Sequence, residues 1–159
     1  MHNTWNGMEF NRTTNAKYYL RRVEKLDNMI KNKMIERDQW KSIATGTTAV
    51  SDGERVQSSG SQQKMADAVC RYVSIEDEII RDINKLCSVK QEIVKTIELL
   101  PATEYDVLHK VYIQYKSLYD VAADYKKTYS WATTVHGRAL KHVQDILDLK
   151  DTGKEVMHE

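Results

Sequence analysis

The residues best suited to bind a ligand lie in one short stretch near the end of the chain, between positions 126 and 141. The stretch combines cations, hydroxyl groups and aromatic rings, carried by Lys126, Lys127, Thr128, Tyr129, Ser130, Trp131, Thr133, Thr134, Arg138 and Lys141. Lysine and arginine side chains bind phosphates, and hydroxyl and aromatic side chains can contact bases. This composition predicts a site for double-stranded DNA. For Trp131, a partly buried packing position is equally compatible with the sequence.

Two short helices must position these residues, one over 117–125 and one from 129 to about 149. The expected buried positions are Leu118, Val121, Ala122 and Tyr125 on the first helix and Ala132, Val135, Ala139, Leu140 and Val143 on the second. Lys126 and Lys127 fall in the turn, and the Thr128 hydroxyl can cap the second helix. With a further helix over 103–115, this is the helix-turn-helix plan, in which the second helix of the pair reads DNA.

Two longer helices precede this group. Apolar residues recur every three or four positions over 13–42 and 65–100, and Pro101 ends the second pattern. Neither helix can bury its apolar stripe alone, so we expect an antiparallel hairpin or a coiled coil with a second chain. The predicted fold is all-α: a coiled-coil-like hairpin over 12–100 with a long polar loop at 44–62, a helix-turn-helix domain over 101–149, and flexible tails at 1–11 and 150–159.

Composition and charge narrow the class of protein. The 159 residues include one proline and six glycines, which is typical of a helical chain. The net charge is only +1, but residues 110–144 hold six Lys and Arg against two Asp, and residues 11–43 hold nine against four acidic residues. Local excesses of this kind occur on phosphate-binding surfaces and equally on solvated helix faces.

The sequence carries no recognisable catalytic or metal-binding pattern. It has no Gly-rich phosphate loop or nucleophile elbow, and the histidines at 2, 109, 136, 142 and 158 lack zinc-ligand spacing. We therefore expect no enzyme activity, no catalytic residues, no metal and no cofactor, with His136 packing at the edge of the bundle. Cys70 and Cys87 lie too far apart on one helix to pair, and no apolar run approaches the roughly 20 residues of a membrane span. These features predict a cytoplasmic protein without a membrane partner.

The stretch over 117–141, with its closing Arg-Ala-Leu-Lys run, resembles the C-terminal promoter-recognition helix-turn-helix of bacterial sigma factors. Over roughly 15–148 the chain is similar to a family of phage and prophage sigma-like regulators of Gram-positive bacteria, related to the autolysin regulatory proteins. The similarity is carried by Tyr-Tyr-Leu at 18–20, Arg-Val-Gln-Ser-Ser at 55–59, Lys-Met-Ala-Asp-Ala-Val at 64–69, and Tyr129 with His-Gly-Arg-Ala-Leu at 136–140. It implies a DNA-binding regulator of phage late or lysis genes, with RNA polymerase as a second partner.

The exposed face of the predicted recognition helix departs from that family. The family tends to carry basic residues there, whereas this chain has Ser130, Thr133 and Thr134. Hydroxyl groups can read bases, but they do not supply the bidentate arginine–guanine contact. A second function therefore stays open: a helical protein-interaction module whose helix-turn-helix no longer binds DNA. The long helices also leave a homo-oligomer open, and the 55–59 motif is either a loop that caps the second long helix or a contact for polymerase or DNA.

Overall fold

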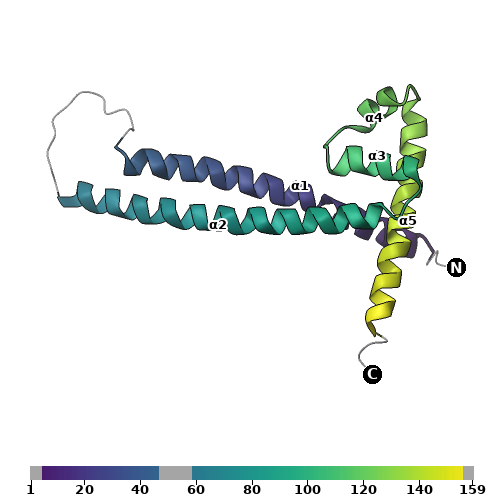
Figure 1. The fold of residues 1–159 in the computed structure, drawn as a ribbon, viewed down its shortest axis with the longest axis horizontal. Helices are drawn as coiled ribbons and strands as arrows, with labels where there is room; N and C mark the ends of the chain where they lie inside the picture. The colour runs from purple at the N-terminus through teal and green to yellow at the C-terminus, as the bar shows by residue number, and fades with distance from the viewer. Residues whose placement is uncertain (1–4, 47–58, 156–159) are drawn as a thin grey trace. The chain divides into compact units, whose positions relative to one another are not determined.

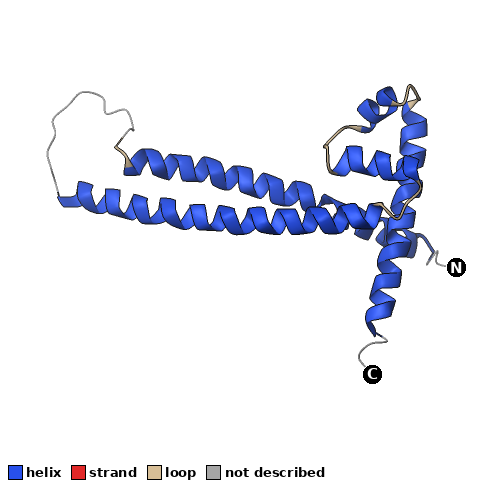
Figure 2. Ribbon diagram, viewed as in Figure 1, coloured by secondary structure: helices blue, strands red, loops and turns tan. Residues whose placement is uncertain are grey.

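The computed structural model describes residues 5–46 and 59–155, and helices account for nearly all of them (Figures 1 and 2). These ranges hold no strand and five helices: α1 (Trp5–Ala44), α2 (Ser59–Ile97), α3 (Ala102–Tyr112), α4 (Leu118–Asp124) and α5 (Tyr129–Glu155). The long helices α1 and α2 pack as a hairpin, and the smaller helices α3 to α5 pack together at the C-terminus. The predicted all-α fold is confirmed.

The helices differ from the expected ones at their ends. α1 begins at Trp5, so the expected tail over 1–11 is helical from that residue onward, and the expected tail over 150–159 is helical up to Glu155. α2 begins at Ser59, inside the segment predicted to be a loop. Positions 47–58, with all of the 55–59 motif except Ser59, lie outside the described residues. The segments where the predicted and observed helix ends differ are mostly polar. They lack the repeated apolar residues from which a helix is predicted.

The chain divides into two compact units. The terminal unit comprises residues 1–25 and 88–159, and the hairpin unit comprises residues 26–87. The division therefore crosses both long helices, while the sequence suggests a boundary at residue 100. Whether residues 101–149 fold alone stays a prediction.

Each unit has its own apolar core. In the hairpin unit, Ile30 of α1 packs with Ile75 and Ile79 of α2, and Met34, Trp40 and Leu86 cover them. In the terminal unit the largest buried side chains come from α1, α2, α3, α4 and α5, including Leu20, Ile93, Leu108, Val121 and Val143. A hydrogen bond of 2.8 Å between Tyr19 Oη and Thr96 Oγ1 joins α1 to α2 within this unit.

Candidate nucleic-acid interface

The predicted helix-turn-helix begins with a capping box at the start of α4. Asp120 N donates to Ser117 Oγ at 3.1 Å, and Ser117 N donates to the Asp120 carboxylate at 3.1 Å. These bonds satisfy backbone donors that a helix start otherwise leaves unpaired. The hydrogen bonds from the Ser117 side chain and then its backbone hold the pKa of Asp120 below its ordinary value. The short helix therefore starts at a defined residue.

The turn between α4 and α5 is held by backbone bonds. Lys126 N donates to Ala123 O and Lys127 N donates to Ala122 O, the paired bonds of a Schellman motif. Lys126 has a left-handed backbone, with a φ of 52°, in the position where glycine is most common. Both lysine side chains of the turn are exposed. Thr128 Oγ1 accepts from Trp131 N at 3.2 Å, which confirms the predicted cap of α5.

One side of α5 is buried as the sequence predicts. The residues of this side are Ala132, Val135, Ala139, Leu140 and Val143, and each is at most 4% exposed. Val135 packs with Val107 of α3 and Val121 of α4. Ala122 is also buried, while Leu118 and Tyr125 are only partly covered. The opposite side of α5 is thereby left at the surface of the unit.

Trp131 does not lie on that free side. It is partly buried against the cluster around Val135, and its ring lies 4.9 Å from the ring of Tyr125 at an angle of 50°. The indole therefore packs α5 against α4 and α3. Tyr125 also donates to Asp106 at 2.6 Å, and burial followed by this bond raises the pKa of Tyr125 to about 12.

The hydroxyl groups of the free face are partly engaged within the helix. Thr133 and Thr134 donate to the carbonyl oxygen of Ser130 at 2.9 and 2.8 Å. Each hydroxyl proton is thereby directed inward, and the oxygen lone pairs remain available as acceptors. In the major groove, acceptors of this kind match the amino groups of adenine and cytosine.

Arg138 is held by a carboxylate that the sequence analysis did not single out. Its Nε donates to Glu104 of α3 at 2.5 Å, and His142 Nδ1 lies 2.6 Å from the other oxygen of the same carboxylate. The Glu104 side chain is 2% exposed, whereas that of Arg138 is 56% exposed. Burial raises the pKa of Glu104, but the bonds from His142 and Arg138 outweigh it and leave the pKa lowered. The signal for Glu104 is its position three and four residues before the buried Val107 and Leu108.

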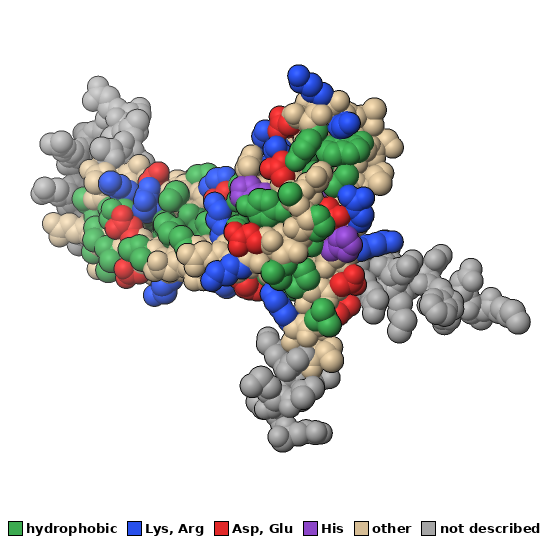
Figure 3. Space-filling view, turned by 45° about the vertical axis from the view of Figure 1, so that its right-hand side comes forward, with side chains coloured by type: hydrophobic (Ala, Val, Ile, Leu, Met, Phe, Trp, Pro, Cys, Tyr) green, Lys and Arg blue, Asp and Glu red, His purple; other side chains and the backbone are tan. Residues whose placement is uncertain are grey.

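An open groove runs along the free side of α5, and it brings together four of the predicted site residues. Its walls are formed by Lys17 of α1 and by Thr133, Thr134, His136, Gly137, Arg138, Leu140 and Lys141 of α5. Lys17 was not predicted, although the basic excess over 11–43 includes it. Cationic and acidic side chains are interspersed over the face drawn in Figure 3. Attraction for phosphate must therefore come from local groups of cations, such as the cations that line this groove.

His136 lies at one side of the groove and is partly buried, which agrees with the predicted packing at the edge of the bundle. Its Nε2 lies 3.1 Å from Tyr112 Oη, and the two rings stack with centroids 5.8 Å apart. Burial, followed by the nearby cations Lys17 and Arg21, lowers the pKa of His136 to about 4. The imidazole is therefore neutral at physiological pH and adds no charge to the groove.

Gly137 leaves the middle of the groove open. A Cβ atom added at this residue would meet no other atom within 4 Å, so no neighbouring side chain requires a glycine here. Glycine inside a helix costs about 1 kcal/mol relative to alanine. The missing side chain therefore has no explanation in the packing of the described residues, and it allows a ligand to approach the helix backbone.

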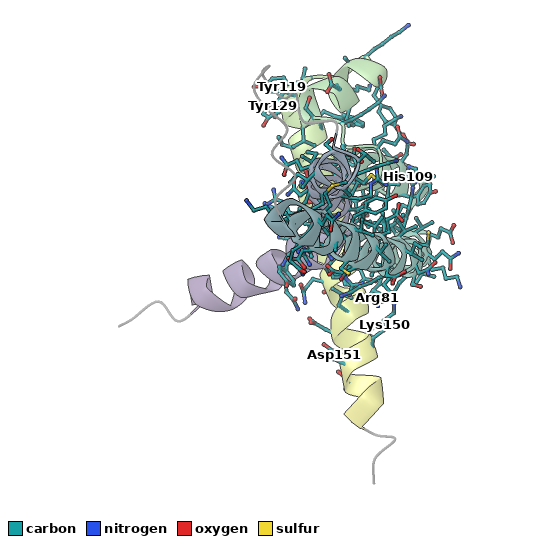
Figure 4. All side chains as sticks on the ribbon, turned by 90° about the vertical axis from the view of Figure 1, so that its left-hand side faces the viewer. Arg81, His109, Tyr119, Tyr129, Lys150 and Asp151 are labelled. Carbon is teal, nitrogen blue, oxygen red and sulfur yellow. The ribbon has the colours of Figure 1, made fainter. Side chains whose placement is uncertain are left out.

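Two exposed tyrosines stack beside the start of α5. The ring centroids of Tyr119 and Tyr129 lie 4.2 Å apart at 16°, and the side chains are 68% and 43% exposed (Figure 4). Tyrosine at such a position offers a polar end to a phosphate and an apolar face to a sugar or methyl group. Tyr119 is a third residue, after Glu104 and Lys17, that the sequence analysis did not assign to the site.

Comparisons of the chain with models of known families, with curated proteins and with solved structures found no match. None of the described helices is long and apolar enough to span a bilayer. In the described part of the chain, no three His, Cys, Asp or Glu side chains gather in a way that could hold a metal ion.

Proposed function

We propose that this protein binds double-stranded DNA through α4 and α5 and regulates transcription. The observation that carries the proposal is the free face of α5, where Ser130, Thr134 and Lys141 are exposed beside the open position at Gly137. The opposite face is buried against α3 and α4. A helix anchored on one side and open on the other can enter the major groove, which admits one helix.

The cations around this face fit the phosphate contacts of such a complex. Lys126 and Lys127 flank the start of α5, and Lys17 and Lys141 flank the groove. Arg138 keeps more than half of its side chain exposed while Glu104 holds its Nε. Phosphate contacts from fixed positions set the register of a protein on DNA, and base contacts then discriminate.

Base discrimination is expected from Ser130, Thr133 and Thr134. Because the two threonine hydroxyls donate inward, they accept from bases and prefer adenine or cytosine at the contacted positions. Promoter recognition together with RNA polymerase, at phage late or lysis genes and in the cytoplasm, is the more specific form of the proposal. It depends on the resemblance to sigma-like regulators.

A second candidate function is a protein-interaction module whose helix-turn-helix does not bind DNA. The observation that favours it is the engagement of the groove side chains within the protein: Arg138 is paired with Glu104, and both threonine hydroxyls are bonded to Ser130. Arg138 is the one arginine of α5, and the bond of its Nε to Glu104 restricts how its guanidinium can turn toward a guanine.

Selection of duplexes from a randomised pool by the full chain separates these functions. We expect one motif to be enriched, and the Thr133→Ala/Thr134→Ala protein to bind it with about 1–3 kcal/mol less discrimination at one or two base pairs. Thr103→Ala, which removes an exposed threonine outside the groove, is the matched control and leaves the preference unchanged. A pool that shows no enrichment would instead favour the interaction module.

A further inference from the structure

The hairpin unit carries a second line of apolar residues on α2, in addition to the line that packs against α1. The inner line includes Ala68, Ile75 and Ile79, which are buried. The outer line has positions spaced three or four apart. Its exposed apolar residues are Met65, Val69, Val73, Ile80, Ile83 and Cys87. Glu76 occupies the position between Val73 and Ile80 and is the one charged residue of the line. We call this second line the outer stripe. Its spacing is that of a helix packing against another helix.

The outer stripe differs from scattered surface hydrophobics. Val69, Val73 and Ile80 are 46%, 48% and 58% exposed and share one side of α2. Ile35 on α1 is 60% exposed, but the exposed apolar residues before and after it on that helix, Met29 and Ile43, do not follow at a spacing of three or four. An open groove lies along the outer stripe and is lined by Val69, Cys70, Val73, Ser74, Asp77 and Arg81.

We propose that the outer stripe docks against the outer stripe of a second copy of this chain, with the two α2 helices antiparallel. An alignment centred on Glu78 places Val73 opposite Ile83 of the second copy and Val69 opposite Cys87 of the second copy. These apolar pairs lie on both sides of the centre, where Ile80 lies opposite Glu76 of the second copy, and Met65 lies opposite Gln91. The packing of two hairpins in this way forms a four-helix bundle.

Charge complementarity favours the antiparallel arrangement. Asp77 and Arg81 lie one turn apart on the same flank of the outer stripe, and in the described residues neither belongs to an ion pair. In a two-fold antiparallel pair, a given flank of one helix faces the same flank of the other helix. Arg81 then lies about 3 Å along the helix axis from Asp77 of the second copy. A parallel pair would instead place this flank of the two copies on opposite sides of the seam, so Asp77 and Arg81 would not meet across it.

Sedimentation of the full chain over a range of micromolar concentrations tests the surface. We expect a dimer whose dissociation constant rises at least roughly tenfold in Ile80→Glu. Ile35→Glu introduces the same charge at an equally exposed residue outside the outer stripe, and it leaves the dimer intact. Circular dichroism shows whether both variants keep their helices. A monomeric wild-type protein overturns the proposal and assigns the stripe to another occupant, such as residues 47–58 or a different protein. Equal weakening by both variants also overturns it.

Charge reversal tests the alignment. Asp77→Arg and Arg81→Asp each place like charges opposite one another, so each weakens the dimer. The double variant exchanges the two charges and restores the attraction, so its dissociation constant returns to within roughly threefold of the wild-type value. A double variant that is weaker than either single variant overturns the antiparallel pairing.

Discussion

The terminal unit and the hairpin unit are both helical, but they are stabilised differently. In the terminal unit, side chains from several helices enclose one another, and even the buried carboxylate of Glu104 has two partners. In the hairpin unit a narrow apolar line joins two helices, and charged side chains bridge them outside it. Lys33 contacts Asp82 at 2.7 Å and Glu78 at 3.1 Å.

The two arrangements respond differently to substitution. Hydrogen bonds with Asp82 and then Glu78 raise the pKa of Lys33, and the bond from Arg71 lowers the pKa of Glu36. These side chains are partly exposed at the edge of the hairpin, so solvent screening leaves only a modest stabilisation from each pair. Side chains in an enclosed core are closely packed and cannot move to accommodate a substituted residue. Precise positioning, which recognition of bases requires, is therefore available in the terminal unit.

The largest difference in stability loss between the units is expected when a charge is placed in the core of the terminal unit. Val135→Asp puts a carboxylate among Val107 and Val121 and destabilises the terminal unit by several kcal/mol. Thermal unfolding measured by circular dichroism shows the loss. Lys33→Met in the hairpin unit, which breaks two ion pairs, leaves the melting temperature nearly unchanged. A similar loss from both substitutions would contradict the comparison.

A smaller effect is expected from pH, and only in the terminal unit. His136 has a folded-state pKa of about 4 and an ordinary value of 6.5, so the unfolded chain binds the proton more readily as pH falls through this window. Stability is therefore lost on acidification, by roughly 2 kcal/mol between pH 7 and pH 5. The charged and titratable groups that face the imidazole are Lys17, Arg21 and Tyr112.

The His136→Gln protein provides the control for this pH effect. Glutamine can still bond to Tyr112 but does not titrate, so chemical denaturation of the variant should show a shallower fall between pH 7 and pH 5. The other histidines are common to both proteins and cancel in the difference. Identical pH profiles would mean that burial does not suppress protonation of His136.

The smallest expected change in stability concerns Gly137, where stability and binding should move in opposite directions. Alanine meets no atom within 4 Å, so Gly137→Ala stabilises α5 by about 0.5–1 kcal/mol. The added methyl group stands in the groove and weakens binding of the selected duplex in an anisotropy titration. Ala123→Gly, at an exposed residue of α4, serves as the reverse control: it lowers stability and leaves the bound geometry unchanged. A variant that is more stable and binds equally well would remove Gly137 from the interface.

Local patterns in the sequence predict much of the fold and part of the site. The apolar spacing predicts the buried side of α5, and the hydroxyl at Thr128 predicts its cap, because both depend on neighbours within one or two turns. The pairing of Glu104 with Arg138 joins residues 34 positions apart, and Lys17 reaches the groove from α1. Such contacts depend on how helices pack, which periodicity alone does not determine. Trp131 packs inward for the same reason.

The salt dependence of DNA binding tests the central claim most directly. Five cations are assigned to phosphates: Lys17, Lys126, Lys127, Arg138 and Lys141. Each contact contributes about 0.9 to the slope of log affinity against log salt, so the wild-type slope is expected near −4.5. Lys141→Ala should reduce its magnitude by about one, while Lys95→Ala, at an exposed lysine of the terminal unit outside the groove, leaves it unchanged. A slope near zero, or the same slope for both variants, would contradict DNA binding through this face of α5.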